Sequence, residues 1–143
     1  MSTVAQILLS KPSHAIHTVA PTATVREAIE QMARQRIGAL LIVEGERILG
    51  IFTERDYIQK VEVRGRTSTE TAIAEVMTAG VMFVTPATTT QECMALMTDK
   101  RLRHLPVLDG GKLVGIISIG DLVKEIISEQ QFVIAQLESY IHS

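Results

Sequence analysis

The feature that most constrains this chain is an internal repeat. The segment GIFTERD, Gly50–Asp56, returns 65 positions later as GIISIGD, Gly115–Asp121. Without a gap, Val19–Lys60 aligns with Val84–Glu125, and 11 of the 42 aligned pairs are identical. Solenoid folds stack three or more repeats of shorter period. Two copies at this spacing therefore predict two matching units related by a pseudo-twofold axis.

Each copy is predicted to fold as strand, helix, strand, strand, helix. In the first copy, VREAIEQMA has the apolar spacing of an amphipathic helix, and Thr24 with Glu27 has the spacing of a capping box at its start. ALLIV and ILGIF then flank a short turn that contains Gly45, which is typical of a hairpin. We therefore predict an α+β fold with one unit over 1–65 and a second over 66–143, joined by the polar stretch VRGRTSTET.

The second unit is predicted to end in a long helix. From Asp121 to Ile141 the sequence contains no Gly or Pro. Its apolar residues lie close to helical spacing, in one set of Leu122, Ile126, Val133, Leu137 and Tyr140 and a second set of Val123, Ile127, Ile134 and Ile141. Such a helix overruns its own unit and leaves apolar surface in water. A homodimer is the simplest way to cover it.

Composition and charge exclude several classes of protein. The net charge of −2 gives no reason to expect a nucleic-acid partner. The apolar run Ile37–Val43 is far shorter than the roughly 20 residues of a membrane helix, and the N-terminus lacks the basic and apolar regions of a signal peptide. A single cysteine, Cys93, fits a reducing compartment. We therefore expect a cytoplasmic protein with no membrane partner.

The repeated motif has two interpretations from its residues alone. Thr53 with Asp56, and Ser118 with Asp121, have the spacing of a helix cap. The same positions also suit a nucleotide, because a helix N-terminus attracts a phosphate and an aspartate one turn later can accept hydrogen bonds from a ribose diol. A glycine in the preceding strand would let a flat ring approach the backbone. Spacing alone leaves the two interpretations open.

The duplicated unit, with G-h-h-[ST]-x-x-D at the end of each hairpin, resembles a tandem pair of CBS (cystathionine-β-synthase-type) domains, the Bateman module. The resemblance runs from about Val4 to Glu125 and includes VAP and VTP, and RIGALLIV and RLRHLPVLD. It implies two βαββα units packed about a pseudo-twofold axis, with two clefts that take adenine nucleotides: AMP, ADP or ATP, and in some members NAD or S-adenosylmethionine. It implies no required metal.

The resemblance also implies which residues line each cleft, with the motif from one unit and the facing strands from the other. In cleft one, Thr53 would bind phosphate, Asp56 the ribose hydroxyls and Arg55 a further phosphate oxygen. The full set for cleft one is Thr53, Arg55, Asp56, Met82, Leu102, Arg103 and His104. The set for cleft two is His17, Ile37, Gly38, Ala39, Ser118 and Asp121. Because Gly38 and Ala39 stand where cleft one has Arg103 and His104, cleft one is expected to be the stronger phosphate site.

Three functions are compatible with the sequence. The favoured one is a regulatory module that binds adenine nucleotides and signals to a downstream protein whose identity the sequence does not give. The second is a dimerisation scaffold whose motifs are only caps. The third, a hydrolase with His104 as base, lacks a nucleophile–base–orienter set, so we expect no enzyme. His14 and His17 lack further ligands for a metal, and Cys93 is expected to be a core residue.

Overall fold

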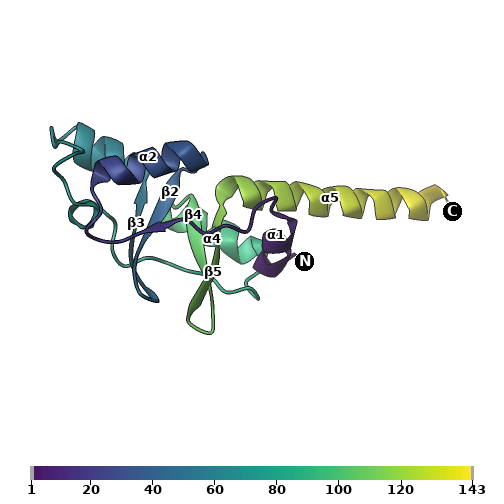
Figure 1. Ribbon diagram of the computed structural model, residues 1–143. Coiled ribbons are helices and arrows are strands. Elements are labelled where there is room, and N and C mark those ends of the chain that lie inside the picture. The colour runs from purple at the N-terminus through teal and green to yellow at the C-terminus, as the bar shows by residue number, and fades with distance from the viewer. Residues whose placement is uncertain (1, 143) are drawn as a thin grey trace. The chain divides into compact units, whose positions relative to one another are not determined.

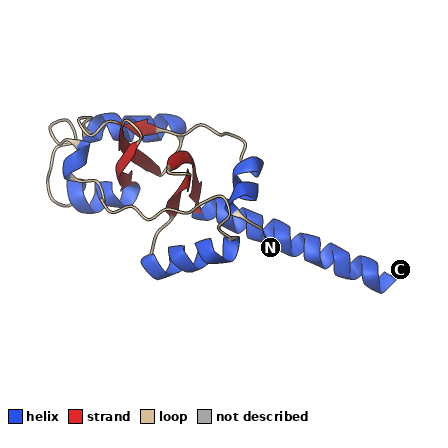
Figure 2. Ribbon diagram, turned by 90° about the horizontal axis from the view of Figure 1, so that it is seen from below, coloured by secondary structure: helices blue, strands red, loops and turns tan. Residues whose placement is uncertain are grey.

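The computed structural model describes residues 2–142, which form two compact units (Figures 1 and 2). One, here the repeat-1 unit, is His17–Val81. The other, the repeat-2 unit, contains the described residues before His17 and after Val81. Each unit combines a small sheet with helices. The predicted α+β class with a long C-terminal helix is confirmed.

The repeat-1 unit is built on a three-stranded sheet in the order β1-β2-β3. β1 is parallel to β2, so the chain between them crosses over through a helix, whereas β2 and β3 form an antiparallel hairpin. The elements are β1 (Thr18–Val19), α2 (Val25–Gln35), β2 (Ala39–Glu44), β3 (Arg47–Thr53), α3 (Glu54–Asp56), a π-helix (Tyr57–Glu62) and a 3-10 helix (Ile73–Glu75).

Helix α2 begins and ends as its sequence predicts. Thr24 Oγ1 accepts a hydrogen bond from the Glu27 N–H at 3.1 Å, and the Glu27 carboxylate accepts one from the Thr24 N–H at 3.3 Å. At the other end Arg36 adopts a left-handed conformation with φ 56°, and its N–H donates to the Met32 carbonyl. Both features recur in the second copy, so the predicted capping boxes are confirmed.

The repeat-2 unit repeats this plan with a reduced sheet. Its elements are α1 (Val4–Ser10), α4 (Thr90–Lys100), β4 (His104–Asp109), β5 (Lys112–Ser118) and α5 (Ile119–His142). β4 and β5 form an antiparallel hairpin. The first strand predicted for this copy is present only as a single parallel bridge between Val84 and Val107.

The segment that precedes the first repeat is buried in the repeat-2 unit, and the segment that precedes the second repeat is buried in the repeat-1 unit. Val4 and Ile7 of α1 are buried in the core of the repeat-2 unit, with Leu105 and Ile117. In the same way, Ile73 and Val76 are buried in the repeat-1 core. The contacts therefore divide the chain differently from the sequence repeat, whose boundary lies between residues 65 and 66. Burial of these short apolar segments accounts for the difference.

Helix α5 is 24 residues long and extends beyond the core of its unit (Figure 1). Leu122 is fully buried, but every residue from Gln131 to His142 is exposed. No helix within residues 2–142 combines the length and the apolar character needed to cross a membrane.

Candidate functional site

The motif of the repeat-1 unit lies where β3 ends and α3 begins. The Thr53 N–H donates to Asp56 Oδ2 at 3.0 Å, and the Asp56 N–H donates to Thr53 Oγ1 at 3.2 Å. Thr53 Oγ1 also lies 3.2 Å from Asp56 Oδ2. These reciprocal bonds form a capping box, so the cap interpretation describes this motif as it stands in the structure.

The second oxygen of Asp56 is bonded to two further side chains. Asp56 Oδ1 accepts a hydrogen bond from Thr78 Oγ1 at 3.1 Å and lies 3.1 Å from Lys60 Nζ. Lys60 Nζ also donates to Thr78 Oγ1 at 3.1 Å. A carboxylate has about four acceptor positions. Those of Asp56 are therefore already used, and the residue is only 7% exposed.

The motif of the repeat-2 unit has the same cap with a different cation. The Ser118 N–H donates to Asp121 Oδ2 at 2.9 Å, and the Asp121 N–H donates to Ser118 Oγ at 3.1 Å. Lys11 Nζ lies 3.0 Å from Asp121 Oδ2 and donates to the Ile116 carbonyl at 2.8 Å. Lys11 and the Ser118 N–H both contact Asp121 Oδ2, and the Ser118 hydroxyl is a further hydrogen-bond partner, whereas Lys60 and Thr78 occupy the second oxygen of Asp56.

The surroundings of Asp121 keep it ionised. Partial burial acts to raise its pKa, but the hydrogen bond from the Ser118 N–H and the charge of Lys11 outweigh burial and hold the pKa of Asp121 below its usual range. The Asp121 side chain is 24% exposed. Beside it lies a hollow of about 40 Å³ that is lined in part by Ser10, Lys11 and Lys124. That space is about the size of a water molecule, so a ribose would have to widen it to reach Asp121.

The glycine of each motif is covered by a side chain from the same unit. A Cβ on Gly50 would lie 2.6 Å from Met77 Sδ and 2.9 Å from the Thr78 carbonyl oxygen. A Cβ on Gly115 would lie 2.7 Å from Leu8 Cδ2. Packing of the chain on itself therefore covers both glycines, with a main-chain contact at Gly50 and only a flexible side chain at Gly115. The approach of a flat ring to these two backbones stays a prediction, and a ring on the Cβ side of either glycine would have to displace Met77 or Leu8.

The other predicted residues of each unit lie beside its motif or farther along the strands. In the repeat-1 unit Ala39 pairs with Thr53, and the Gly38 carbonyl accepts a hydrogen bond from the Glu54 N–H. In the repeat-2 unit His104 pairs with Ser118, and the Arg103 carbonyl accepts one from the Ile119 N–H. The side chains of Arg55, Met82 and Arg103 are exposed, and those of His17, Ile37 and Leu102 are half-buried.

Sequence reasoning missed Lys60, Thr78 and Lys11, which complete the surroundings of the two aspartates. Lys60 follows Asp56 by four residues, a spacing that places the two side chains on one face of a helix and was a usable signal. Lys11 and Thr78 belong to the segments that precede the repeats. Their contacts with the motifs depend on how these segments pack, which no local pattern indicates.

The cysteine and the possible metal ligands do not form a reactive site among the described residues. Cys93 is fully buried, as predicted, and burial, aided by the nearby Glu92 charge, raises the pKa of its thiol to about 11. Among residues 2–142, no three His, Cys, Asp or Glu side chains are grouped closely enough to hold a metal ion.

Comparison with known proteins supports the repeat and shows which family the chain resembles. The sequence model described as "CBS domain" matches residues 4–62 and again residues 73–128. The chain is similar to a solved CBS-domain protein from Burkholderia ambifaria, with 56% identity, a TM-score of 0.87 and coverage of 90% of this chain and 96% of that one. It also resembles the structure of CBSX2 in complex with AMP, at 22% identity and a TM-score of 0.73, over 91% of this chain and 99% of that chain.

Among proteins known by sequence, the chain is 39% identical over 123 residues to the mitochondrial CBS domain-containing protein CBSX3 of Arabidopsis thaliana. The match covers 82% of this chain and 60% of CBSX3, so the chain spans less than two thirds of that relative.

Proposed function

The chain belongs to the CBS domain family, and from that premise we propose that it is a regulatory module that binds an adenine nucleotide and signals by a change of conformation. The repeated motif at Thr53–Asp56 and Ser118–Asp121 is the proposed binding element, with AMP, ADP, ATP or NAD as ligand. The module is proposed to carry no enzymatic activity and to need no metal.

The observation that carries the proposal is the arrangement around Ser118 and Asp121. Asp121 is held ionised and is partly exposed, and Lys11 and the Ser118 N–H both contact its Oδ2. An ionised carboxylate with acceptor capacity left can bind a ribose diol. The strand that pairs with Ser118 begins at His104, next to the exposed Arg103, so the Arg103 guanidinium is proposed as a phosphate contact at the same end of the hairpin.

The two motifs are proposed to differ in strength. The sequence predicts that cleft one, which combines Thr53 and Asp56 with Arg103 and His104, is the stronger phosphate site. The hydrogen bonds of Asp56 weaken its expected affinity for a sugar, because a ribose can reach Asp56 only by displacing Lys60 or Thr78. We therefore propose that Asp121 binds sugar hydroxyls more readily than Asp56, whereas the Arg103 guanidinium favours a phosphate near it.

Signalling requires that the ligand bind one conformation more tightly than another. If a nucleotide displaces Lys60 or Lys11, the segments that these lysines and Thr78 tie to the motifs would be released. We propose a homodimer in a reducing compartment such as the cytoplasm, because α5 exposes many large apolar side chains and the single cysteine is a buried thiol.

A second candidate function is a dimerisation scaffold that binds no nucleotide. The observation that favours it is the fully bonded Asp56, which is 7% exposed and completes a cap. Capping alone would explain the repeat of Thr53 and Ser118, since both close a helix N-terminus.

A melting experiment separates the two candidates. AMP is the first ligand to test, because CBSX2 was solved with AMP, followed by ADP, ATP and NAD. A nucleotide at 100-fold excess over its dissociation constant adds about 2.7 kcal/mol to the free energy of unfolding and should raise Tm by roughly 5–10 °C. Asp121→Ala should abolish the increase. Glu92→Ala, which removes a capping acid outside the motifs, should lower Tm but retain the increase. No shift with any nucleotide would favour the scaffold.

A further inference from the structure

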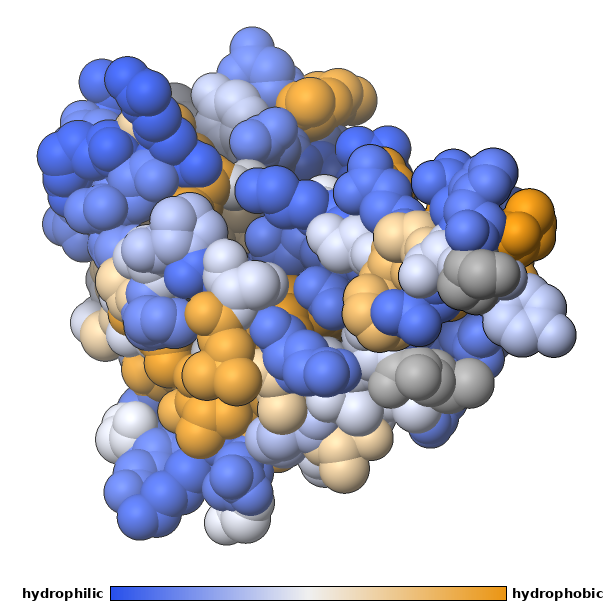
Figure 3. Space-filling model, turned by 90° about the vertical axis from the view of Figure 1, so that its right-hand side faces the viewer, coloured by the Kyte–Doolittle hydropathy of each residue, from blue (hydrophilic) through white to orange (hydrophobic). Residues whose placement is uncertain are grey.

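The C-terminal half of α5 exposes several large apolar side chains. Val133, Ile134 and Leu137 are 51%, 54% and 57% exposed, and Ile141 is 73% exposed. Figure 3 looks toward this end of the helix and shows apolar side chains at the surface among polar ones. Water contact over so many apolar side chains is unfavourable, and on a folded protein it marks an interaction surface.

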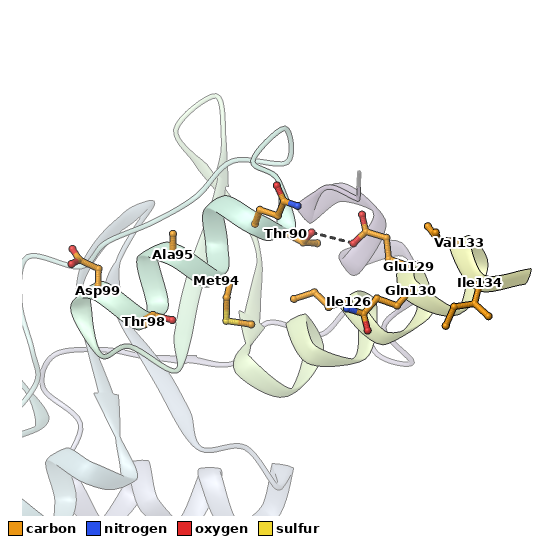
Figure 4. Close-up of a pocket in the computed structure, with 11 residues that line it drawn as sticks. Thr90, Met94, Ala95, Thr98, Asp99, Ile126, Glu129, Gln130, Val133 and Ile134 are labelled. Carbon is orange, nitrogen blue, oxygen red and sulfur yellow. Dashed lines mark hydrogen bonds between the residues drawn. The ribbon is translucent and has the colours of Figure 1, made fainter. Parts of the chain in front are cut away.

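A groove of about 860 Å³ lies next to this surface, between α4 and α5 (Figure 4). Met94 of α4 and Ile126 of α5 point toward one another in the groove. Thr90 Oγ1 and Glu129 Oε2, 3.4 Å apart, bridge the two helices at one end. The lining is mainly apolar or uncharged: Met94, Ala95, Thr98, Ile126, Gln130, Val133 and Ile134.

The exposed residues of α5 have the spacing of a coiled-coil seam. Successive members of the seam alternate in steps of four and three residues, which is the heptad pattern of positions a and d. The seam consists of Val123, Ile127, Gln130, Ile134, Leu137 and Ile141. All six are exposed, although Val123 and Ile127 lie in the half of the helix that packs on its own unit. A straight helix with such a seam is suited to pair with another helix.

We propose that a second copy of this chain covers the seam, and that the two α5 helices pair in an antiparallel orientation. The register with most overlap places Val123 opposite Ile141 of the second copy and Ile127 opposite Leu137 of the second copy. Gln130 then faces Ile134 of the second copy. A twofold axis generates each of these contacts twice, as in a closed dimer. This proposal specifies the homodimer proposed above and is independent of nucleotide binding.

Charge complementarity selects this orientation. Lys124 and Glu138 flank the seam on the same side. In the antiparallel register, Lys124 lies next to Glu138 of the second copy at both ends of the interface. Gln131 meets Gln131 of the second copy at the centre, where two amides can exchange hydrogen bonds. In a parallel pair in register, Lys124 and Glu138 would lie about 21 Å apart along the axis and could not meet. Opposite charges therefore favour the antiparallel pair.

The same register fills the groove between α4 and α5. On the other flank of the seam, Tyr140 of the second copy lies beside Ile126, at the wall that Ile126 shares with Met94. Val133 meets Val133 of the second copy. The C-terminal half of one α5 would thus occupy the groove of the other copy, and the exposed surface and the groove would cover each other.

The area is sufficient for a stable dimer. From their exposed fractions, the apolar side chains of the seam and its Val133–Tyr140 flank present roughly 750 Å² per copy, close to the 800 Å² that each partner buries in a standard interface. Phe132 is 66% exposed but lies on the opposite face of the helix from the seam, so it stays outside the interface.

Sedimentation analysis of the full chain at micromolar concentration tests the interface. Wild type is expected to be a dimer, and Leu137→Asp is expected to raise the dimer dissociation constant roughly a hundredfold or more, because it buries a charge. Phe132→Asp is the matched control, with the same new charge on the opposite face, and should remain a dimer. A monomeric wild type, or a Leu137→Asp variant that dimerises as tightly as wild type, would overturn the proposal.

A charge exchange tests the orientation. Lys124→Glu and Glu138→Lys should each weaken the dimer by about tenfold, because each creates two like-charge contacts, and the double exchange should restore it. Lack of restoration would exclude the antiparallel register. AMP binding is measured on the same samples. A monomer that binds AMP would refute only the dimer, and a dimer that binds no nucleotide would refute only the proposed function.

Discussion

The glycines of the two motifs provide the sharpest test of how the structure uses them. An alanine at Gly50 would bring its Cβ to 2.6 Å from Met77 Sδ and to 2.9 Å from the main-chain oxygen of Thr78. That oxygen accepts a hydrogen bond from the Ile51 N–H at 2.9 Å, so it cannot retreat without breaking the bridge. At Gly115 the new Cβ would meet only Leu8 Cδ2, the end of a flexible side chain, at 2.7 Å.

These contacts give different expected losses of stability. Overpacking costs about 1–3 kcal/mol, and replacing a strand glycine by alanine recovers about 0.5–1 kcal/mol of that. Gly50→Ala should therefore lower the free energy of unfolding by about 1–2 kcal/mol and Tm by roughly 2–8 °C. Gly115→Ala should change the free energy by less than about 0.5 kcal/mol, since Leu8 can turn aside.

Thermal and urea unfolding of both variants measure this difference directly. Combining Gly50→Ala with Met77→Ala should recover only part of the loss that Gly50→Ala adds, because the carbonyl contact remains. Equal stability of the two single variants would refute the assignment of Gly50 to main-chain packing. Loss of nucleotide affinity with unchanged stability would do so as well, and would favour a ring seated on the glycine.

Three further predictions follow from the polar contacts. Cys93, with a pKa of about 11 and no exposed surface, should react with iodoacetamide at pH 8 at least a hundredfold more slowly in the native protein than in urea. Lys11→Met should lower the free energy of unfolding by about 1 kcal/mol at pH 7. Because the pKa of Asp121 is depressed below 3.8, the difference from wild type should disappear as acid titration protonates Asp121 at lower pH. Thr78→Val removes a donor to Asp56 and should cost about 1 kcal/mol in urea unfolding, with Thr85→Val, at an exposed hydroxyl, as the control.

The repeat made much of the fold predictable from sequence. Local signals are strong at Thr24 with Glu27 and in the apolar stripe that follows, because capping and helix periodicity depend on neighbouring residues. The hairpin around Gly45 was equally visible, and this glycine does adopt a left-handed φ of 62°. The position of α1 was not predictable, since its Val4 and Ile7 contact residues about a hundred positions away.

The candidate site was predictable in its residues but not in its bonding. The spacing of Thr53 and Asp56 predicted both a cap and a ligand contact, and the cap bonds are formed. Whether a carboxylate can accept further hydrogen bonds depends on partners such as Lys60 and Thr78, which belong to another helical turn and another segment of the chain. The assignment of residues to two nucleotide clefts stays a prediction.

Calorimetric titration of AMP tests the central claim most directly. The account predicts saturable binding to the wild-type protein, loss of binding in Asp121→Ala, and a smaller decrease in Asp56→Ala, whose carboxylate is already occupied by Lys60 and Thr78. Glu92→Ala should bind as wild type does. Identical heats for wild type and both aspartate variants, or no heat from AMP, ADP, ATP or NAD with folded protein, would contradict it.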